Sequence, residues 1–175
     1  MKKFEFLSHT ADVKIRVYGK NLKEIINNSL LALKSFWKPK LTKTKIEKEI
    51  KIEANNEINL LIDFLSEVLS ETYLRKAIFV KFEINADLAD LTQTIADKDK
   101  FILRINTDQK RINTDDNIRV NQRENQHLSA FYSLSGKIIG YKFTSLSKDI
   151  KAITYHQANL KKINNYYQFE FIIDI

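Results

Sequence analysis

The sequence has no cysteine, three glycines and one proline among its 175 residues. The lack of cysteine excludes disulfide scaffolds, thiol catalysis, iron–sulfur clusters and zinc sites with cysteine ligands. Walker loops and GxGxxG turns need several glycines close together, so nucleotide binding through either motif is also excluded. No stretch approaches the roughly 18 consecutive apolar residues of a membrane span. The start, MKKFEFLSHTADV, is too polar for a signal peptide, so we expect a cytoplasmic protein.

The composition is that of a globular protein, with 43% hydrophobic and 29% charged residues. A chain of this length forms one domain with a core large enough to need no disulfide or structural metal. The formal net charge is +7, which favours polyanionic partners or the acidic face of another protein. The charge does not decide between these partners.

Two segments have the hydrophobic periodicity of amphipathic helices. Asn21 followed by Glu24 resembles a capping box, and Pro39 is expected to end the first helix. A second helix is expected from about Glu57. The apolar stripes consist of Leu22, Ile25, Ile26, Leu30, Leu33 and Trp37 in the first helix, and of Leu61, Phe64, Leu65, Val68 and Leu69 in the second.

Strands are predicted before, between and after these helices. Residues 13–17 alternate apolar and basic side chains, and a lysine-rich segment containing Ile46, Ile50 and Ile52 is typical of an exposed edge strand. Further strands are expected near 77–84, in HLSAFYSL and IGYKFTSL on either side of Gly136, and in a C-terminal hairpin that turns at 164–165. This order predicts an α+β two-layer sandwich, with two helices packed on one face of a mixed or antiparallel sheet.

The stretch from about 87 to 126 differs from the rest of the chain. It is polar and carries the pentapeptide RINTD at 104–108 and again at 111–115. Two copies of so short a unit cannot form a solenoid. We therefore expect a single domain over 1–175 with an inserted polar excursion at about 87–126, containing a hairpin around Phe101 to Ile105.

Two carboxylates stand at ends of predicted strands. Asp12 precedes the strand 13–17 on the parity of its polar face, and Asp174 is followed only by Ile175 with its free α-carboxylate. A hard cation requires oxygen donors that converge from separate elements, and neighbouring strands 13–18 and 166–175 would supply them. The alternative interpretations are a solvated carboxylate at Asp12 and a frayed terminus at Asp174.

The remaining polar residues give weaker indications. His9, His127 and His156 lack HExxH or HxxxH spacing and no GxSxG elbow is present, so His156 is expected to be a packed strand residue. The lysines between Lys38 and Lys51 are typical of a protected strand edge or of a docking surface for an anionic partner. Aromatic residues of the kind that stack on bases do not alternate with these lysines, which argues against direct single-strand binding there.

The two ends of the chain resemble a known family. HTADVKIRVYGKNLKEIINNSLLAL is similar to the archease signature, and IKAITYH with the ending FIIDI resembles the late hairpin and terminal aspartate of the same family. The resemblance covers about 4–86 and 127–175 and implies an SHS2-like archease fold. Departures from the family pattern are the long 87–126 stretch, Lys137 where a glutamate is usual and Thr144 where a histidine is usual.

The resemblance also implies a function. Archeases are non-catalytic protein cofactors of the GTP-dependent RNA ligase of tRNA splicing; they promote its guanylylation and its multiple turnover. It further implies a divalent metal site, with calcium as the expected ion, formed by Asp12, Asp174 and the terminal group of Ile175. RNA would then be met through the ligase complex, and no membrane is involved.

Two other functions compete with this hypothesis. The net charge of +7 also suits a stand-alone RNA-binding or RNA-chaperone module, whose binding would fall steeply with salt. A metal-dependent phosphoesterase centred on His9 and Asp12 is disfavoured, because a few carboxylates without a general base make a poor hydrolytic site.

Overall fold

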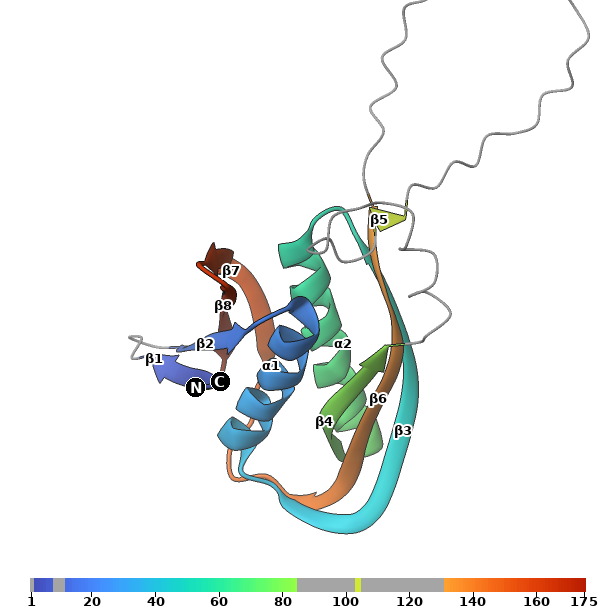
Figure 1. Ribbon diagram of the computed structural model, residues 1–175. Coiled ribbons are helices and arrows are strands. Elements are labelled where there is room, and N and C mark those ends of the chain that lie inside the picture. Colours follow the sequence, from blue (N-terminus) through green and yellow to red (C-terminus); the bar gives the residue numbers. More distant parts are fainter. Residues whose placement is uncertain (1, 8–11, 85–102, 105–130) are drawn as a thin grey trace, which may run out of the picture.

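The computed structural model describes residues 2–7, 12–84, 103–104 and 131–175. Two helices lie between two antiparallel sheets (Figure 1). The terminal sheet has the strand order β1-β2-β8-β7, and the long-strand sheet has the order β3-β6-β4 with β5 paired to β6. The elements are β1 (Phe4–Leu7), β2 (Val13–Gly19), α1 (Leu22–Trp37), β3 (Lys40–Ala54), α2 (Glu57–Arg75), β4 (Ala77–Ile84), β5 (Leu103–Arg104), β6 (Phe131–Ser145), β7 (Ala152–Ile163) and β8 (Tyr166–Asp174).

The first helix begins and ends where the local sequence predicts, and the second begins at the predicted Glu57. The Asn21 side chain accepts a hydrogen bond of 2.9 Å from the backbone N–H of Glu24, which satisfies one of the free donors of the first turn of α1. The Glu24 carboxylate in turn accepts from the backbone N–H of Lys20 at 2.9 Å. Lys38 closes α1 in the left-handed conformation directly before Pro39. The predicted cap and stop of the first helix are therefore confirmed.

Core side chains pack between the helix pair and each of the two sheets. α1 packs against β2 and β4, and α2 packs against β7 and β3, so each helix contacts both sheets (Figure 1). Ile15 and Val17 of β2 and Phe169 and Phe171 of β8 are completely buried on the face toward the helices. Burial of one such side chain contributes about 2 kcal/mol. The α+β class and the packing of two helices on antiparallel sheet are confirmed, and the strands divide into two sheets instead of one.

The strand β6 runs without a break through both of its glycines, so the prediction of two strands flanking Gly136 is wrong. A Cβ atom at Gly140 would lie 2.2 Å from the carbonyl oxygen of Ile78 in β4. At Gly136 it would lie 2.7 Å from the Phe82 ring. The glycines permit close approach of a neighbouring strand and ring, and they do not mark a turn.

The predicted edge strand is confirmed, because β3 lies at one edge of the long-strand sheet. Ile46, Ile50 and Ile52 share its inner side, where Ile50 is buried and the other two pack against the core. The C-terminal hairpin turns at Asn164, which has a φ of 54°. The short strand β1 was not predicted, since four residues carry too little periodicity to be recognised.

The predicted excursion at 87–126 lies outside the described residues except for Leu103 and Arg104. These two pair with Tyr132 and Phe131 of β6. The remainder of the expected hairpin around Phe101 to Ile105 is also outside the described part. In the part that the structure describes, no helix is both long and apolar enough to cross a membrane.

Candidate functional site at the end of the terminal sheet

Three segments distant in sequence meet at one end of the terminal sheet, where β2 and β7 begin and β8 finishes. β2 and β8 are antiparallel neighbours with Val13 opposite Ile173, and β7 pairs with β8 so that Ala152 is opposite Asp174. Continuing the first register by one residue sets Asp12 opposite Asp174. The strand adjacency on which the predicted pair of aspartates depends is therefore present.

The end of the chain is tied to the start of β7. The backbone N–H of Lys151 donates to the carbonyl oxygen of Asp174 at 2.8 Å. The Lys151 ammonium donates to an oxygen of Ile175 at 2.8 Å, which places a positive charge beside the terminal carboxylate. Ile175 itself is 44% exposed. Lys151 belongs to this site, and sequence reasoning did not single it out.

An anchor from α2 fixes the position of Lys151. The Tyr73 hydroxyl donates to the carbonyl oxygen of Ile150 and accepts from the N–H of Ile150, both at 2.9 Å. Ile150 is buried, so this double contact satisfies a backbone unit that water does not reach. A tyrosine on the polar side of a helix gives no sign of such a role in the sequence.

The outer face of the terminal sheet carries a network of ion pairs between strands. Arg16 of β2 bonds Glu170 of β8 at 2.7 Å and Glu5 of β1 at 3.1 Å, and Lys14 lies 3.0 Å from Glu170. Burial raises the pKa of Glu170, but hydrogen bonds from Arg16 and Lys14 outweigh it, and the pKa is lowered. The side chains that alternate with the core residues of β2 thus join three strands.

Among the described carboxyl groups, Glu5 has the pKa that is lowered most. Hydrogen bonds from Lys2 and Tyr18, opposed by desolvation and assisted by Arg16, lower the pKa of Glu5 from 4.5 to about 2. The ionised form of Glu5 is therefore favoured by folding.

The predicted packed position of His156 is wrong. β7 bulges between Thr154 and Asn159, and within this bulge His156 is exposed and Gln157 has a φ of 54°. Tyr155, from the same bulge, donates a hydrogen bond to Asp63 of α2. The period-two pattern misassigned His156 because extra residues in a bulge change the face on which later side chains lie.

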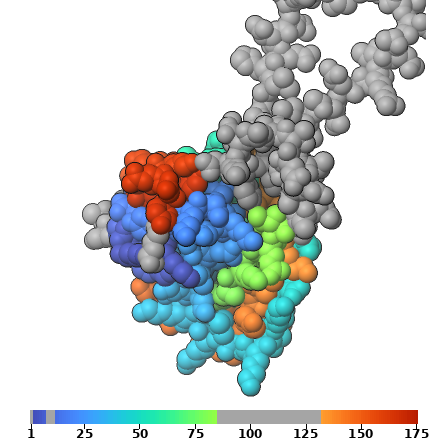
Figure 2. Space-filling model, in the orientation of Figure 1, coloured from blue at the N-terminus to red at the C-terminus, as the bar shows by residue number. Residues whose placement is uncertain are grey.

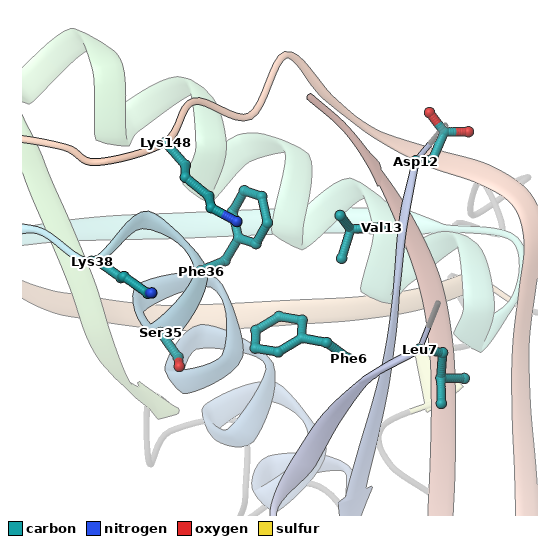
Figure 3. A pocket seen from close by; sticks show the side chains of 8 residues that line it. All are labelled: Phe6, Leu7, Asp12, Val13, Ser35, Phe36, Lys38 and Lys148. Carbon is teal, nitrogen blue, oxygen red and sulfur yellow. The ribbon is translucent and has the colours of Figure 1, made fainter. Parts of the chain in front are cut away.

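A cavity of about 480 Å³ opens beside the same edge. It is lined by Phe6, Leu7, Asp12, Val13, Ser35, Phe36, Lys38 and Lys148. Figure 3 shows Asp12 at one end, with its carboxylate turned away from the ammonium groups of Lys38 and Lys148 at the other. The cavity therefore has a carboxylate at one end and a cationic, aromatic opposite end.

Comparison with models of protein families shows to which family this chain belongs. Residues 4–175 match the model of the Archease protein family (MTH1598/TM1083). The chain belongs to the archease family. It is 28% identical over 183 aligned residues to the protein archease of Sulfurisphaera tokodaii, with 100% of both chains covered. It is 26% identical to the archease of Methanosarcina barkeri, covering 99% of this chain and 97% of that one.

Solved structures agree in fold. The solution structure of protein 1598 of Methanobacterium thermoautotrophicum matches with a TM-score of 0.62 at 18% identity, covering 100% of both chains. The crystal structure of an archease of Thermotoga maritima, described as a possible chaperone, matches with a TM-score of 0.57 at 15% identity, covering 97% of this chain and 94% of that one. The archease fold expected from the resemblance is confirmed.

The candidate metal ligands at this end of the terminal sheet are of the type that a hard cation prefers. Asp12, Asp174 and the terminal carboxylate of Ile175 supply only oxygen atoms, which calcium and magnesium prefer. Within residues 2–7, 12–84, 103–104 and 131–175, no group of three or more His, Cys, Asp or Glu side chains is placed to hold a metal ion. His9 lies outside these residues. Calcium binding by Asp12, Asp174 and Ile175 stays a prediction.

Proposed function

We propose that this archease-family chain is a non-catalytic protein cofactor of the GTP-dependent RNA ligase of tRNA splicing. It promotes guanylylation of the ligase and supports multiple turnover by the ligase. It acts in the cytoplasm. The ligase binds the GTP, because this chain lacks the glycine-rich loops that cradle nucleotide phosphates. Contact with the RNA substrate arises in the ligase complex.

One observation carries the proposal. The segments that carry the archease resemblance lie apart in sequence, yet Asp12, Lys151 and Asp174 are gathered at one edge of the terminal sheet. Polar side chains at strand ends are accessible to a partner, whereas the same strands bury their other face against the helices. An edge formed by β2, β7 and β8 together suits the recognition of a folded protein.

In this proposal Asp12, Asp174 and the terminal carboxylate of Ile175 hold a divalent cation, which we expect to be calcium. The ion would supply positive charge that offsets the repulsion among these carboxylates. Lys151 balances the terminal carboxylate when the ion is absent, since its ammonium bonds an oxygen of Ile175.

The first test measures ligase turnover on RNA ends with and without this chain. We expect substoichiometric amounts to raise the number of turnovers, and the purified chain alone to join no RNA and hydrolyse no GTP. Hydrolysis of GTP by the ligase-free chain, or an unchanged turnover number, would contradict the proposal.

The second test changes the site itself. We expect Asp12→Ala and Asp174→Ala to abolish activation and weaken calcium binding in calorimetry. Removal of Ile175 should act in the same direction, because it shifts the terminal carboxylate by one residue. Asp149→Ala is the matched control, since Asp149 is an exposed aspartate of the β6–β7 connection. Variants at Asp12 and Asp174 that activate the ligase like Asp149→Ala would show that the site is wrong.

A further inference from the structure

Exposed lysines gather at the end of the molecule where α1 and α2 finish and where β6 leads into β7. We call this group the basic end; it consists of Lys38, Lys40, Lys76, Lys142 and Lys148, all of which are exposed. Chain near residue 40 and residue 140 forms the lower part of the view in Figure 2. The group combines lysines from three regions of the sequence, 38–40, 76 and 142–148.

Backbone contacts hold these lysines in one region. Lys40 pairs with Ser145, and Lys142 pairs with Ala77, the residue after Lys76. The connection that carries Lys148 is fixed to the end of α1 through Ser147. The N–H of Ser147 donates to the Trp37 carbonyl oxygen at 2.9 Å, and its hydroxyl donates to the Lys38 carbonyl oxygen at 3.2 Å.

The described carboxylates of the chain do not neutralise the charges of the basic end. Among the described residues, none of the five lysines makes an ion pair. Proximity to the carboxyl ends of the helices stabilises lysines such as Lys38 and Lys76. That effect does not account for Lys142 and Lys148, which come from β6 and the β6–β7 connection. The concentration of unpaired charge therefore suits an anionic ligand.

Aromatic rings border the basic end on the side of the 480 Å³ cavity. Phe6 is 42% exposed, and its ring centroid lies 6.1 Å from that of Phe36. The Lys148 ammonium stands 4.8 Å from the centroid of Phe36. In Figure 3 the ammonium groups of Lys38 and Lys148 and the hydroxyl of Ser35 lie at the same end of the cavity as the rings of Phe6 and Phe36.

We propose that this cavity and the basic end bind a single-stranded polynucleotide, with a base against Phe6 and phosphates on Lys38 and Lys148. Proteins that bind single strands combine an aromatic platform with a positively charged track for the backbone. The cavity volume of about 480 Å³ lies in the usual range for small-ligand sites and admits one nucleotide. An acidic protein segment without aromatic or apolar side chains would use the lysines but would leave the rings of Phe6 and Phe36 uncovered.

This direct contact goes beyond the proposed ligase cofactor role and does not depend on it. The lysine-rich stretch lacks alternating aromatic residues in sequence, which argued against single-strand binding. The fold supplies the rings from β1 and α1, at positions 6 and 36, beside Lys38. The test below contains no ligase, so its outcome is separate from that of the turnover experiment.

The experiment measures fluorescence anisotropy of a labelled single-stranded RNA of about 12 nucleotides, a length within the range of known single-strand sites, at increasing salt. We expect salt-sensitive binding by the full chain. Lys38→Asn with Lys148→Gln should weaken binding about tenfold and reduce the magnitude of the log–log salt slope by about 1.4, as expected for two lost phosphate contacts. Asparagine is chosen at Lys38 because it tolerates the left-handed backbone found there.

A matched control separates the site from overall charge. Lys45→Gln with Lys51→Gln removes the same number of positive charges from the outer face of β3, where these lysines pair with Glu47 and Glu53. We expect this variant to bind RNA within about twofold of the parent, since its lysines contact no phosphate. Thermal unfolding of each variant verifies that the fold is kept.

The base contact is tested by Phe6→Leu and Phe6→Tyr. Leucine removes the stacking surface and should weaken binding about tenfold, whereas tyrosine keeps it and should bind like the parent. The proposal would be overturned if the Lys38/Lys148 and Lys45/Lys51 double variants lost the same RNA affinity. It would also be overturned if the parent showed no salt-sensitive RNA binding. It would also be overturned if polyglutamate displaced the RNA as effectively as unlabelled RNA while Phe6→Leu had no effect, because the site would then recognise an acidic protein.

Discussion

The ion pairs of the two sheets differ in their exposure to solvent. In the terminal sheet, ion pairs join different strands through Arg16, Lys14 and Glu170, with side-chain exposures between 12% and 31%. In the long-strand sheet, Lys45–Glu47 and Lys51–Glu53 lie within one strand and Lys137–Glu47 joins β6 to β3, with side-chain exposures between 38% and 62%. Exposed pairs of that kind contribute little, because solvent screens them and side-chain entropy opposes them.

The difference corresponds to strand length. β3 and β6 have 15 residues each and pair along most of their length, so backbone hydrogen bonds suffice to set their register. β1 and β2 have 4 and 7 residues. Side-chain contacts between strands therefore carry more of the positioning in the terminal sheet, where the candidate site lies.

The largest effect is expected from Gly140→Ala in the long-strand sheet. The added Cβ would lie 2.2 Å from the Ile78 carbonyl oxygen, and this backbone cannot move without separating β4 from β6. We expect a loss of about 3 kcal/mol in the free energy of unfolding, measured by urea denaturation. Ser135→Ala on the same strand is the control and should change stability by less than about 0.5 kcal/mol. A Gly140→Ala protein as stable as this control would contradict the close approach of β4.

The next effect concerns the terminal sheet. Arg16→Ala leaves Glu170 and Glu5 without their shared partner, and both carboxylates are partly shielded from water. We expect a loss of about 2 kcal/mol in the free energy of unfolding. The comparison variant Lys51→Ala, in an exposed pair with Glu53, should cost less than about 0.5 kcal/mol. Equal losses would remove the distinction between the two sheets.

A smaller effect is expected with pH. The pKa of Glu5 falls from 4.5 to about 2 on folding, so its ionised side chain adds stability that is fully present above about pH 4.5. This contribution is lost as the pH falls toward 2. The stability advantage of the parent over Glu5→Gln should therefore shrink through this window in urea titrations. An advantage that stays constant down to about pH 2 would contradict the role of Glu5.

The smallest effect is expected from removal of residues 90–124 and closure with a short flexible linker. Loop-closure entropy varies only logarithmically with length, so the change in the free energy of unfolding should be about 1 kcal/mol or less. The deletion also removes β5, which contributes two residues to the edge of the pairing with β6. Loss of a cooperative thermal transition would show that this stretch is part of the core.

Local patterns in the sequence determined much of the fold. The cap at Asn21, the stop at Pro39 and the turn at Asn164 follow from interactions within a few residues. The polar parity of Lys14 and Arg16 likewise follows from alternation along one strand. Such features need no knowledge of distant contacts, and the same alternation identified Asp12 as a candidate.

Contacts between distant segments were decided only by the tertiary structure. The division of the strands into two sheets, the anchor between Tyr73 and Ile150, and the bulge that exposes His156 depend on elements far apart in the chain. Alternation specifies which side chains share a face but not which strand lies beside another, since every apolar face is satisfied equally by any well-fitting neighbour. For the same reason the lysine run that includes Lys38 and Lys40 could be recognised in the sequence, but its position next to Phe6 and Phe36 could not.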